Sequence, residues 1–269
     1  MNKRIGFIGT GNMGKAMIGG IVNSKLVPSN NVIIYDLNND KLNAIRDEYN
    51  VEIGSSEEEV VINSDILFIA VKPNIYDLVL EKIKGKLTKD KIIVTIAAGK
   101  TIKSVEEVIG KEYKVVRTMP NTPALVNEGM SSLCANEIVS EEELNQVKTI
   151  FESFGKAEIL PEHLIESVIG VSGSSPAYTF MFIEALADGA VLAGMARDKA
   201  YKFAAQAVLG AAKMVLETGK HPGELKDMVC SPGGTTIEAV RTLEERGFRS
   251  AVIEAMINCM DKSKEMSQK

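Results

Sequence analysis

Short apolar runs alternate with longer amphipathic segments through the first part of the chain. The segments between the runs are helix-like, and two begin with a capping-box pattern, Ser55 with Glu58 and Ser140 with Glu143. Gly155 is placed to end the helix that follows Ser140. Five runs rich in isoleucine and valine have the length and composition of buried parallel strands: residues 3–8, 32–36, 65–71, 92–97 and 114–118. This alternation predicts an α/β domain with a doubly wound sheet.

The pattern changes near residue 160, where strand signals end and alanine, methionine and leucine dominate. We therefore expect two domains, residues 1–160 and an all-helical domain over residues 161–269. Its expected helices span residues 176–195, 198–218, 222–229, 235–246 and 249–266. Residues 176–195 are apolar nearly all round, which predicts a helix buried on all sides. So small a domain with so much apolar helix surface is expected to pack against a second copy.

Composition excludes several classes of function. The chain has 269 residues and a formal net charge of −5, and no cluster of lysine or arginine stands out, so nucleic acid and anionic membranes are not expected partners. The three cysteines form no C-x-x-C pair, so no metal site and no disulfide framework are indicated, which fits a reducing cytoplasm. The N-terminus shows no apolar signal segment. The longest apolar stretch contains Glu184 and Asp188, which argues against a membrane span.

The stretch IGFIGTGNMGKAM contains the pattern G-x-G-x-x-G as Gly9, Gly11 and Gly14. A predicted strand precedes the pattern, a predicted helix follows it, and Asp36 ends the next strand. In this context the glycines let the backbone approach a pyrophosphate at the helix N-terminus, which predicts a dinucleotide cofactor. The alternative is a purely structural glycine turn.

Asp36 is expected to accept a hydrogen bond from a ribose 2′-hydroxyl and to repel a 2′-phosphate, which favours NADH. The alternative is a turn-forming residue before Leu37.

Three further segments follow predicted strands, at the sheet edge where open α/β folds bind ligands. In AVKPN, Lys72 is placed to contact phosphate or ribose; alternatively Lys72 is solvated and Asn74 caps a helix. Residues 97–99 are small enough to lie under a nicotinamide ring, and in MPNTP the side chains of Asn121 and Thr122 could reach the cleft. For each segment, ordinary turn chemistry is the alternative.

The stretch CSPGGTTIEAV, residues 230–240, places turn residues and two threonines at the start of a predicted helix. Unpaired N–H groups and the helix dipole both favour an anion there. A well-capped turn without a ligand is the alternative.

Acid–base candidates are few. His163 and His221 are both flanked by turn residues and are more typical of surface or capping positions. A nicotinamide enzyme without an evident proton donor suggests a substrate that arrives protonated, such as an iminium ion.

The chain resembles the pyrroline-5-carboxylate reductases over essentially its full length. The resemblance rests on IGFIGTGNMGKA, AVKP, AAG, MPNTPALV, GVSGSSPAY and, most specifically, HPGELKDMVCSPGGTTIEAVRTLEERGF. It implies reduction of 1-pyrroline-5-carboxylate to L-proline with NADPH or NADH, the last step of proline biosynthesis. It also implies an N-terminal Rossmann domain, a helical dimerisation domain, and a homodimer that often assembles further into a homodecamer.

The resemblance assigns residues to two sites. The substrate carboxylate would be held by the loop Ser231–Thr236, with Thr236 near the ring nitrogen as the catalytic contact and Glu162 lining the pocket in some members. The loop residues are Ser231, Gly233, Gly234, Thr235 and Thr236. The residues expected at the cofactor are Ile8, Gly9, Thr10, Gly11, Asn12, Met13, Gly14, Asp36, Ala70, Val71, Lys72, Pro73, Ala97, Ala98, Gly99 and Asn121. Many members have a small or hydroxyl residue at the position of Asp36, so a preference for NADPH is in doubt here.

Two other functions fit parts of the pattern. A 3-hydroxy acid dehydrogenase shares the glycine motif followed by helices, but it needs a catalytic lysine, and Lys199, Lys202 and Lys213 have the spacing of helix-surface charges. A non-catalytic protein that senses nicotinamide nucleotides would bind the cofactor without turnover.

Overall fold

A computed structural model describes residues 1–267 of the chain, which divide into two compact units. The first unit comprises residues 1–174 together with the segment from Cys259 onward, and the second comprises residues 175–258. The expected boundary at residue 160 lies before the segment 161–174, which packs with the first unit.

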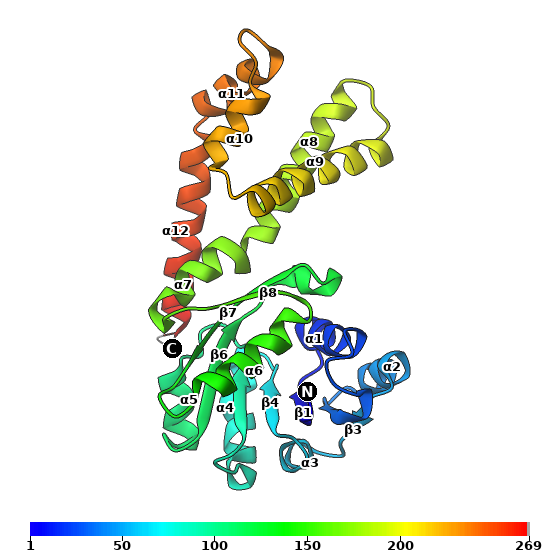
Figure 1. The fold of residues 1–269 in the computed structure, drawn as a ribbon, viewed down its shortest axis with the longest axis vertical. Helices are drawn as coiled ribbons and strands as arrows, with labels where there is room; N and C mark the ends of the chain where they lie inside the picture. The colour runs from blue at the N-terminus through cyan, green and yellow to red at the C-terminus, as the bar shows by residue number, and fades with distance from the viewer. Residues whose placement is uncertain (268–269) are drawn as a thin grey trace. The chain divides into compact units, whose positions relative to one another are not determined.

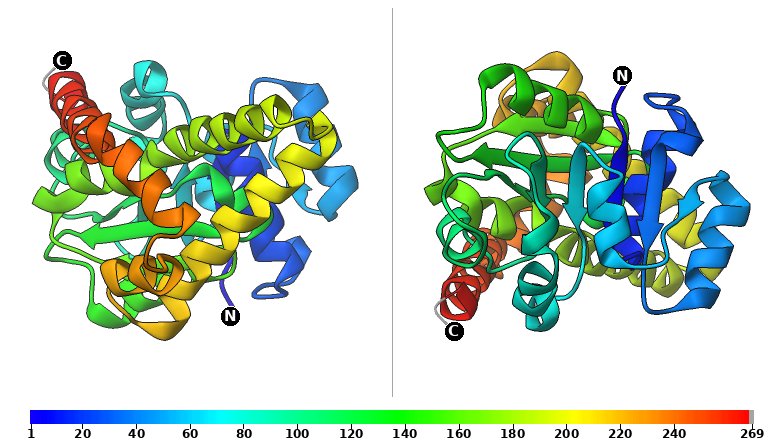
Figure 2. Two further views of the ribbon diagram at one scale, coloured as in Figure 1. Left: turned by 90° about the horizontal axis from the view of Figure 1, so that it is seen from above. Right: turned by 90° about the horizontal axis from the view of Figure 1, so that it is seen from below.

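The first unit is built on one eight-stranded sheet with the order β3-β2-β1-β4-β5-β6-β7-β8 (Figures 1 and 2). All neighbouring strands are parallel except β6 and β7. The chain order reverses direction between β1 and β4, which makes their carboxyl ends the expected ligand position. The strands are β1 (Ile5–Ile8), β2 (Val32–Tyr35), β3 (Glu52–Ile53), β4 (Ile66–Ile69), β5 (Ile92–Thr95), β6 (Lys114–Met119), β7 (Gly129–Ala135) and β8 (Gly155–Ile159).

Helices cover both faces of this sheet. Alternate strand residues point to opposite faces, so Phe7 and Phe68 pack on one face while Leu67 and Ile69 pack on the other. The first face is covered by α1 (Asn12–Asn23), α2 (Asn39–Tyr49) and α6 (Glu141–Glu152); the second by α3 (Glu57–Ile62), α4 (Pro73–Ile83) and α5 (Ile102–Ile109). The doubly wound α/β prediction is confirmed.

All five predicted strands are present, but three further strands were not predicted. These are β3, β7 and β8. The prediction that Gly155 ends a helix is wrong. The helix α6 ends at Glu152, and Gly155 begins β8, where a Cβ atom would lie 2.0 Å from the carbonyl oxygen of Gly129. Close approach of two strands therefore explains this glycine.

One of the two predicted capping boxes is confirmed. At Ser140, the side chain accepts from the Glu143 N–H and the Glu143 carboxylate accepts from the Ser140 N–H. The box at Ser55 is displaced by one residue, because α3 begins at Glu57 and its N-cap is Ser56, which accepts from the Glu59 N–H. The side chain of Ser55 instead donates to the Glu59 carboxylate.

The segment that leads out of the first unit is short and irregular. A turn at Glu162–Leu164 is followed by α7 (Ile165–Val168) and a π-helical turn, Ile169–Gly173.

The second unit is built from helices joined by short loops, and these helices lie close to the expected spans. Its helices are α8 (Ser175–Leu192), α9 (Arg197–Thr218), α10 (Pro222–Val229), α11 (Thr235–Glu245) and most of α12 (Phe248–Ser267), whose last part belongs to the first unit. The contact between α8 and α9 buries small residues, Ala187, Ala200 and Ala204.

Within one chain, α8 is not buried on all sides as predicted. Ala187 is its buried residue, whereas Phe180, Met181 and Leu192 are 64%, 69% and 91% exposed. The sequence pattern correctly predicts that α8 is apolar nearly all round, but the single chain leaves much of this apolar surface exposed.

Candidate active site

The glycine motif forms a tight connection between β1 and α1. Gly9 has a φ of +97°, and its N–H donates to the carbonyl of Tyr35 at 2.8 Å. A Cβ atom at Gly9 would lie 2.6 Å from the carbonyl oxygen of Ala70, and one at Gly14 would lie 2.6 Å from that of Gly9. Gly11 is the N-cap of α1 and no side chain caps the helix. The first turn therefore keeps N–H groups available to an anion.

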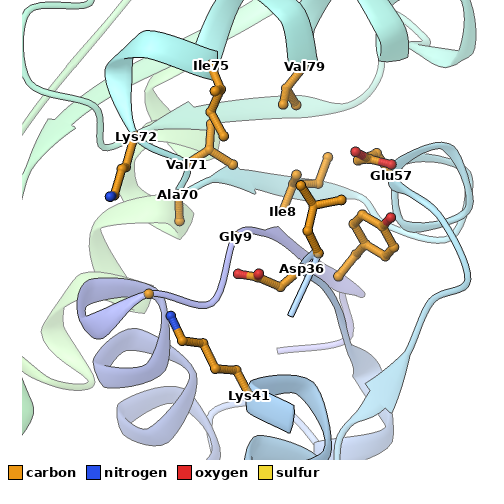
Figure 3. Close-up of a pocket in the computed structure, with 13 residues that line it drawn as sticks. Ile8, Gly9, Asp36, Lys41, Glu57, Ala70, Val71, Lys72, Ile75 and Val79 are labelled. Atoms are coloured by element: carbon orange, nitrogen blue, oxygen red, sulfur yellow. The ribbon is translucent and has the colours of Figure 1, made fainter. Parts of the chain in front are cut away.

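A pocket lies at the carboxyl ends of β1, β2 and β4 (Figure 3). Seven of the residues expected at the cofactor line it: Ile8, Gly9, Gly11, Asp36, Ala70, Val71 and Lys72. Thr10, Gly11 and Asn12 line an adjoining hollow together with Lys15 and Lys41. Residues that are widely separated in sequence thus meet where the strand order reverses, as expected of a dinucleotide site.

Sequence reasoning missed six residues of this pocket: Tyr35, Leu37, Lys41, Glu57, Ile75 and Val79. Leu37 is 80% exposed directly after the acidic end of β2. The available sequence signal was a leucine directly after Asp36, at the end of a predicted strand. The others come from the end of β2 and from α2, α3 and α4, and they carry no local signal.

Asp36 is engaged with the glycine loop in this structure. Its Oδ2 accepts from the Thr10 N–H at 2.7 Å and from the Thr10 hydroxyl at 3.0 Å, and its Oδ1 accepts from the Asn38 N–H at 3.0 Å. Burial raises the pKa of Asp36, but these hydrogen bonds and the charge of Lys41 outweigh burial and hold the pKa below its usual value. Figure 3 shows Lys41 reaching from α2 toward the space beside this carboxylate. Asp36 thus fixes the loop that would face a pyrophosphate.

Lys72 is the N-cap residue of α4, with Pro73 at the first helical position. The alternative in which Asn74 caps the helix is therefore wrong. The side chain of Lys72 is exposed at the rim of the pocket (Figure 3), free to meet a polar group of a bound cofactor.

The remaining expected cofactor residues lie outside the main pocket. Met13 and Gly14 lie in the first turn of α1, and residues 97–99 follow β5. Asn121 follows β6 and is only 7% exposed. Its Oδ1 accepts from the Met130 N–H at 2.8 Å, and its Nδ2 donates to the Ser172 carbonyl at 3.0 Å. Asn121 therefore joins β7 to the π-helical turn, a role that the sequence did not indicate.

The loop before α11 leaves the first turn of that helix without a side-chain cap. Gly233 has a φ of +66°, and the Gly234 N–H donates to the Ser231 carbonyl at 3.0 Å, closing a turn. Gly234 is the N-cap of α11 and no side-chain cap is present. Thr236 is half-buried, while Ser231 and Thr235 are exposed. A shallow hollow here is lined by Gly233, Gly234, Thr235, Glu238, Ala239 and Thr242.

Glu162 lies in the first unit, in a partly buried ionic cluster around Arg117. Its Oε1 accepts from the Ile102 N–H at 2.8 Å and from Arg117 at 3.0 Å. The Arg117 side chain is 5% exposed and also pairs with Glu166 at 3.6 Å. Next to this cluster, Cys134 is buried, and burial together with the charge of Glu162 raises the pKa of its thiol to about 12. This cysteine is a core residue, not a nucleophile.

The two histidines and the helical lysines are placed as the sequence indicates. His221 is the N-cap of α10 and its Nδ1 accepts from the Gly223 N–H, while His163 is exposed. Lys199, Lys202 and Lys213 are exposed on helix surfaces. Among residues 1–267, no group of three or more metal-ligating side chains could hold a metal ion, and no helix is long and apolar enough to cross a membrane.

Two family models match the chain. Residues 4–99 match the NADP oxidoreductase, coenzyme F420-dependent family, and residues 162–266 match the pyrroline-5-carboxylate reductase dimerisation family. The first match spans the glycine motif and the pocket; the second spans the loop before α11.

Relatives match over the full length. The chain is 56% identical over 268 residues to a pyrroline-5-carboxylate reductase of Escherichia coli, covering 100% of both chains. A pyrroline-5-carboxylate reductase structure from Coxiella burnetii superposes with a TM-score of 0.94 at 33% identity, covering 100% of both chains. A Plasmodium falciparum pyrroline carboxylate reductase with NADP bound superposes with a TM-score of 0.89 at 34% identity, covering 99% of this chain and 98% of that one.

The glycine loop, the pocket at the reversal of strand order and the matching oxidoreductase family together define a nicotinamide-dependent oxidoreductase with a Rossmann domain. Full-length similarity at this level identifies the particular family. The chain belongs to the pyrroline-5-carboxylate reductases.

Proposed function

We propose that the chain reduces 1-pyrroline-5-carboxylate to L-proline with NADH or NADPH, the last step of proline biosynthesis, in the cytoplasm. The observation that carries the proposal is the 56% identity with the Escherichia coli reductase over 268 residues, a match that spans both the glycine loop and the loop before α11. The NADP bound to the Plasmodium falciparum structure supports the cofactor class.

The chemistry is a hydride transfer. A bound NADH or NADPH would supply a hydride to the carbon of the ring C=N⁺ bond, and the C=N π electrons would become a lone pair on nitrogen, which gives a secondary amine and the oxidised cofactor. A protonated imine needs no general acid, which agrees with two histidines that serve a cap and the surface. The protein's task is to place the two reactants and to hold the substrate's carboxylate.

The loop before α11 is the proposed carboxylate site. Ser231, Thr235 and Thr236 supply hydroxyls, and the uncapped first turn of α11 supplies backbone N–H groups. Gly233 and Gly234 allow the turn that exposes these groups. Thr236 is the proposed contact to the ring nitrogen, and Glu162 is retained as an expected residue of the substrate pocket.

A turnover assay tests the reaction directly. Absorbance of NADH or NADPH should fall when 1-pyrroline-5-carboxylate is added, and L-proline should accumulate in equal amount. Oxidation of 3-hydroxy acids without this activity would instead support a hydroxy acid dehydrogenase. Cofactor binding without any turnover would instead support a non-catalytic protein that senses nicotinamide nucleotides.

NADH should be used at least comparably to NADPH, because Asp36 lies beside the pocket. A carboxylate near a 2′-phosphate costs on the order of 1 kcal/mol at high effective dielectric, about tenfold or less in affinity. The variant Asp36→Ser should shift preference toward NADPH, and it should also weaken both cofactors because the clamp on Thr10 is lost. Asp36→Asn is the matched control, since it removes the charge but keeps an acceptor for Thr10. A hundredfold preference of the wild type for NADPH would contradict this role of Asp36.

The second unit is the proposed dimer interface, and a homodecamer is the expected assembly. Light scattering at micromolar concentration should give at least twice the chain mass of 29.1 kDa. Phe203 on α9 is 67% exposed, so Phe203→Asp should favour the monomer; Leu78→Asp, at a 72% exposed site on α4, should not. An active, folded monomer in the wild type would contradict the proposal.

A further inference from the structure

The loop between β5 and α5 is anchored by Ala97, which packs in the core, and by Lys100, whose Nζ lies 2.7 Å from the Asp77 carboxylate on α4. Residues 97–99 sit between Thr95, the end of β5, and Lys100. Within the loop the hydrogen bonds are long: the Ala97 N–H reaches the Thr95 hydroxyl at 3.4 Å, and the Lys100 N–H reaches the Ala97 carbonyl at 3.3 Å. Gly99 adopts a φ of +79°. The position of residues 97–99 therefore depends both on the Lys100–Asp77 pair and on where α5 begins.

The start of α5 is fixed from a distant part of the chain. Thr101 and Ser104 form a capping box, which satisfies N–H groups within the helix itself. The N–H of Ile102, the first helical residue, instead donates to the Glu162 carboxylate, 60 residues away. A carboxylate at this point also meets the positive end of the helix dipole.

Glu162 is itself held in place. Arg117 on β6 donates to the same Glu162 oxygen at 3.0 Å, and its guanidinium is 5% exposed. The backbone of Arg117 pairs with Thr95 in the sheet. Glu162 therefore connects the two ends of residues 96–101. It contacts the start of α5 directly, and it contacts the end of β5 through Arg117 on β6.

We propose that Glu162 is a positioning residue for the nicotinamide half of the cofactor, acting through α5 and residues 97–99. The inference rests on the proposed placement of the cofactor. The second half of the doubly wound sheet, where β4 and β5 lie, receives the nicotinamide mononucleotide when the adenosine occupies the β2 side. This role differs from the expected one, in which Glu162 lines the substrate pocket.

Glu166 provides a matched control. It pairs with the same Arg117 guanidinium at 3.6 Å, but it makes no hydrogen bond to α5. Loss of either glutamate removes one ion pair of the buried Arg117 side chain, whereas loss of Glu162 alone releases the start of α5. A merely structural role would make Glu162 and Glu166 variants alike.

The test measures binding of NADH and of ADP-ribose, which lacks the nicotinamide, by calorimetry. Glu162→Ala should weaken NADH about fivefold, the equivalent of a lost helix cap, and leave ADP-ribose within about twofold. Glu162→Gln keeps an acceptor for the Ile102 N–H and should restore most of the NADH affinity even if the alanine variant folds poorly. Glu166→Gln should lower the melting temperature and change neither affinity.

Three results would overturn the inference: equal weakening of NADH and ADP-ribose, equal effects of the Glu162 and Glu166 variants, or unchanged NADH affinity with a raised KM for 1-pyrroline-5-carboxylate. The last would restore the substrate-pocket role. Because both ligands bind without turnover, the inference is tested even if the wild type fails to reduce 1-pyrroline-5-carboxylate, which would refute only the proposed function.

Discussion

The variant Thr236→Val should lose about ten- to a hundredfold in kcat/KM for 1-pyrroline-5-carboxylate while its affinity for NADH stays nearly unchanged. Valine keeps the shape of threonine and removes the hydroxyl. A hydrogen bond to a charged group is worth roughly 1.5–3 kcal/mol, which gives this range. The glycine motif at Gly9–Gly14 is in the other unit, so cofactor affinity should not respond. Kinetics, cofactor titration and thermal unfolding on one preparation make the measurement.

A helix cap is the competing explanation for Thr236. Loss of a cap would lower stability by roughly 1 kcal/mol and leave turnover intact. In the structure no side chain caps α11, which already weakens that explanation. Thr149→Val is the control: it lies on α6, outside both candidate sites, and its hydroxyl donates to the Asn145 carbonyl, so it should alter kinetics little. Unchanged turnover with a lowered melting temperature in Thr236→Val would refute the substrate contact.

Gly9→Ala and Gly11→Ala should fail in different ways although they lie two residues apart. A Cβ atom at Gly9 would lie 2.6 Å from a backbone oxygen, on a residue whose φ is +97°. Both the contact and the backbone conformation are unfavourable, so we expect a loss of at least about 2 kcal/mol in unfolding free energy.

Gly11 has a φ of −63°, and a Cβ atom there meets nothing within 4 Å. Gly11→Ala should therefore unfold like the wild type but bind NADH and NADPH about tenfold more weakly, because the methyl group occupies space in front of the α1 N–H groups. Denaturant unfolding and cofactor titration of both variants make the comparison. Normal cofactor binding by Gly11→Ala would mean that no pyrophosphate approaches this turn.

The central strands were predictable because each is a continuous apolar run, buried on both faces. The three missed strands lack that signal. In β7 the buried residues include Ser131 and Ser132, which interrupt the apolar run. In β8 only Ala157 is buried, as befits a strand at the sheet edge, and β3 has two residues. Such strands are stabilised by pairing with neighbours, and pairing across tens of residues leaves no local pattern.

The candidate site also combines local features, which the sequence predicts, with non-local contacts, which it does not. The glycine motif is local, since its turn and its helix are consecutive in sequence, and the structure brings it to the pocket. The partners of Asp36, Asn121 and Glu162 are not local: the hydrogen bonds join residues 26, 51 and 60 positions apart. Sequence reasoning identified these polar residues as ligands, whereas in the structure each one also supports the fold around a ligand. A polar side chain near a site can do both, and spacing alone does not distinguish the two.

The return of the chain to the first unit has a consequence for its synthesis. Cys259 packs against the core on the α4 and α5 face, and its Sγ lies 3.1 Å from the Ser174 hydroxyl. Residues 175–258 are therefore an insertion between the two segments of the first unit. The second segment, from Cys259 onward, is synthesised only after them. The strands of the sheet are complete by residue 159, whereas the apolar surface that Cys259 contacts stays uncovered by this segment until residue 259 has been synthesised. A short linker that joins residue 174 to residue 259 should let the first unit fold without residues 175–258. Breaking the chain at either point, without such a linker, would separate residues 1–174 from the segment that begins at Cys259.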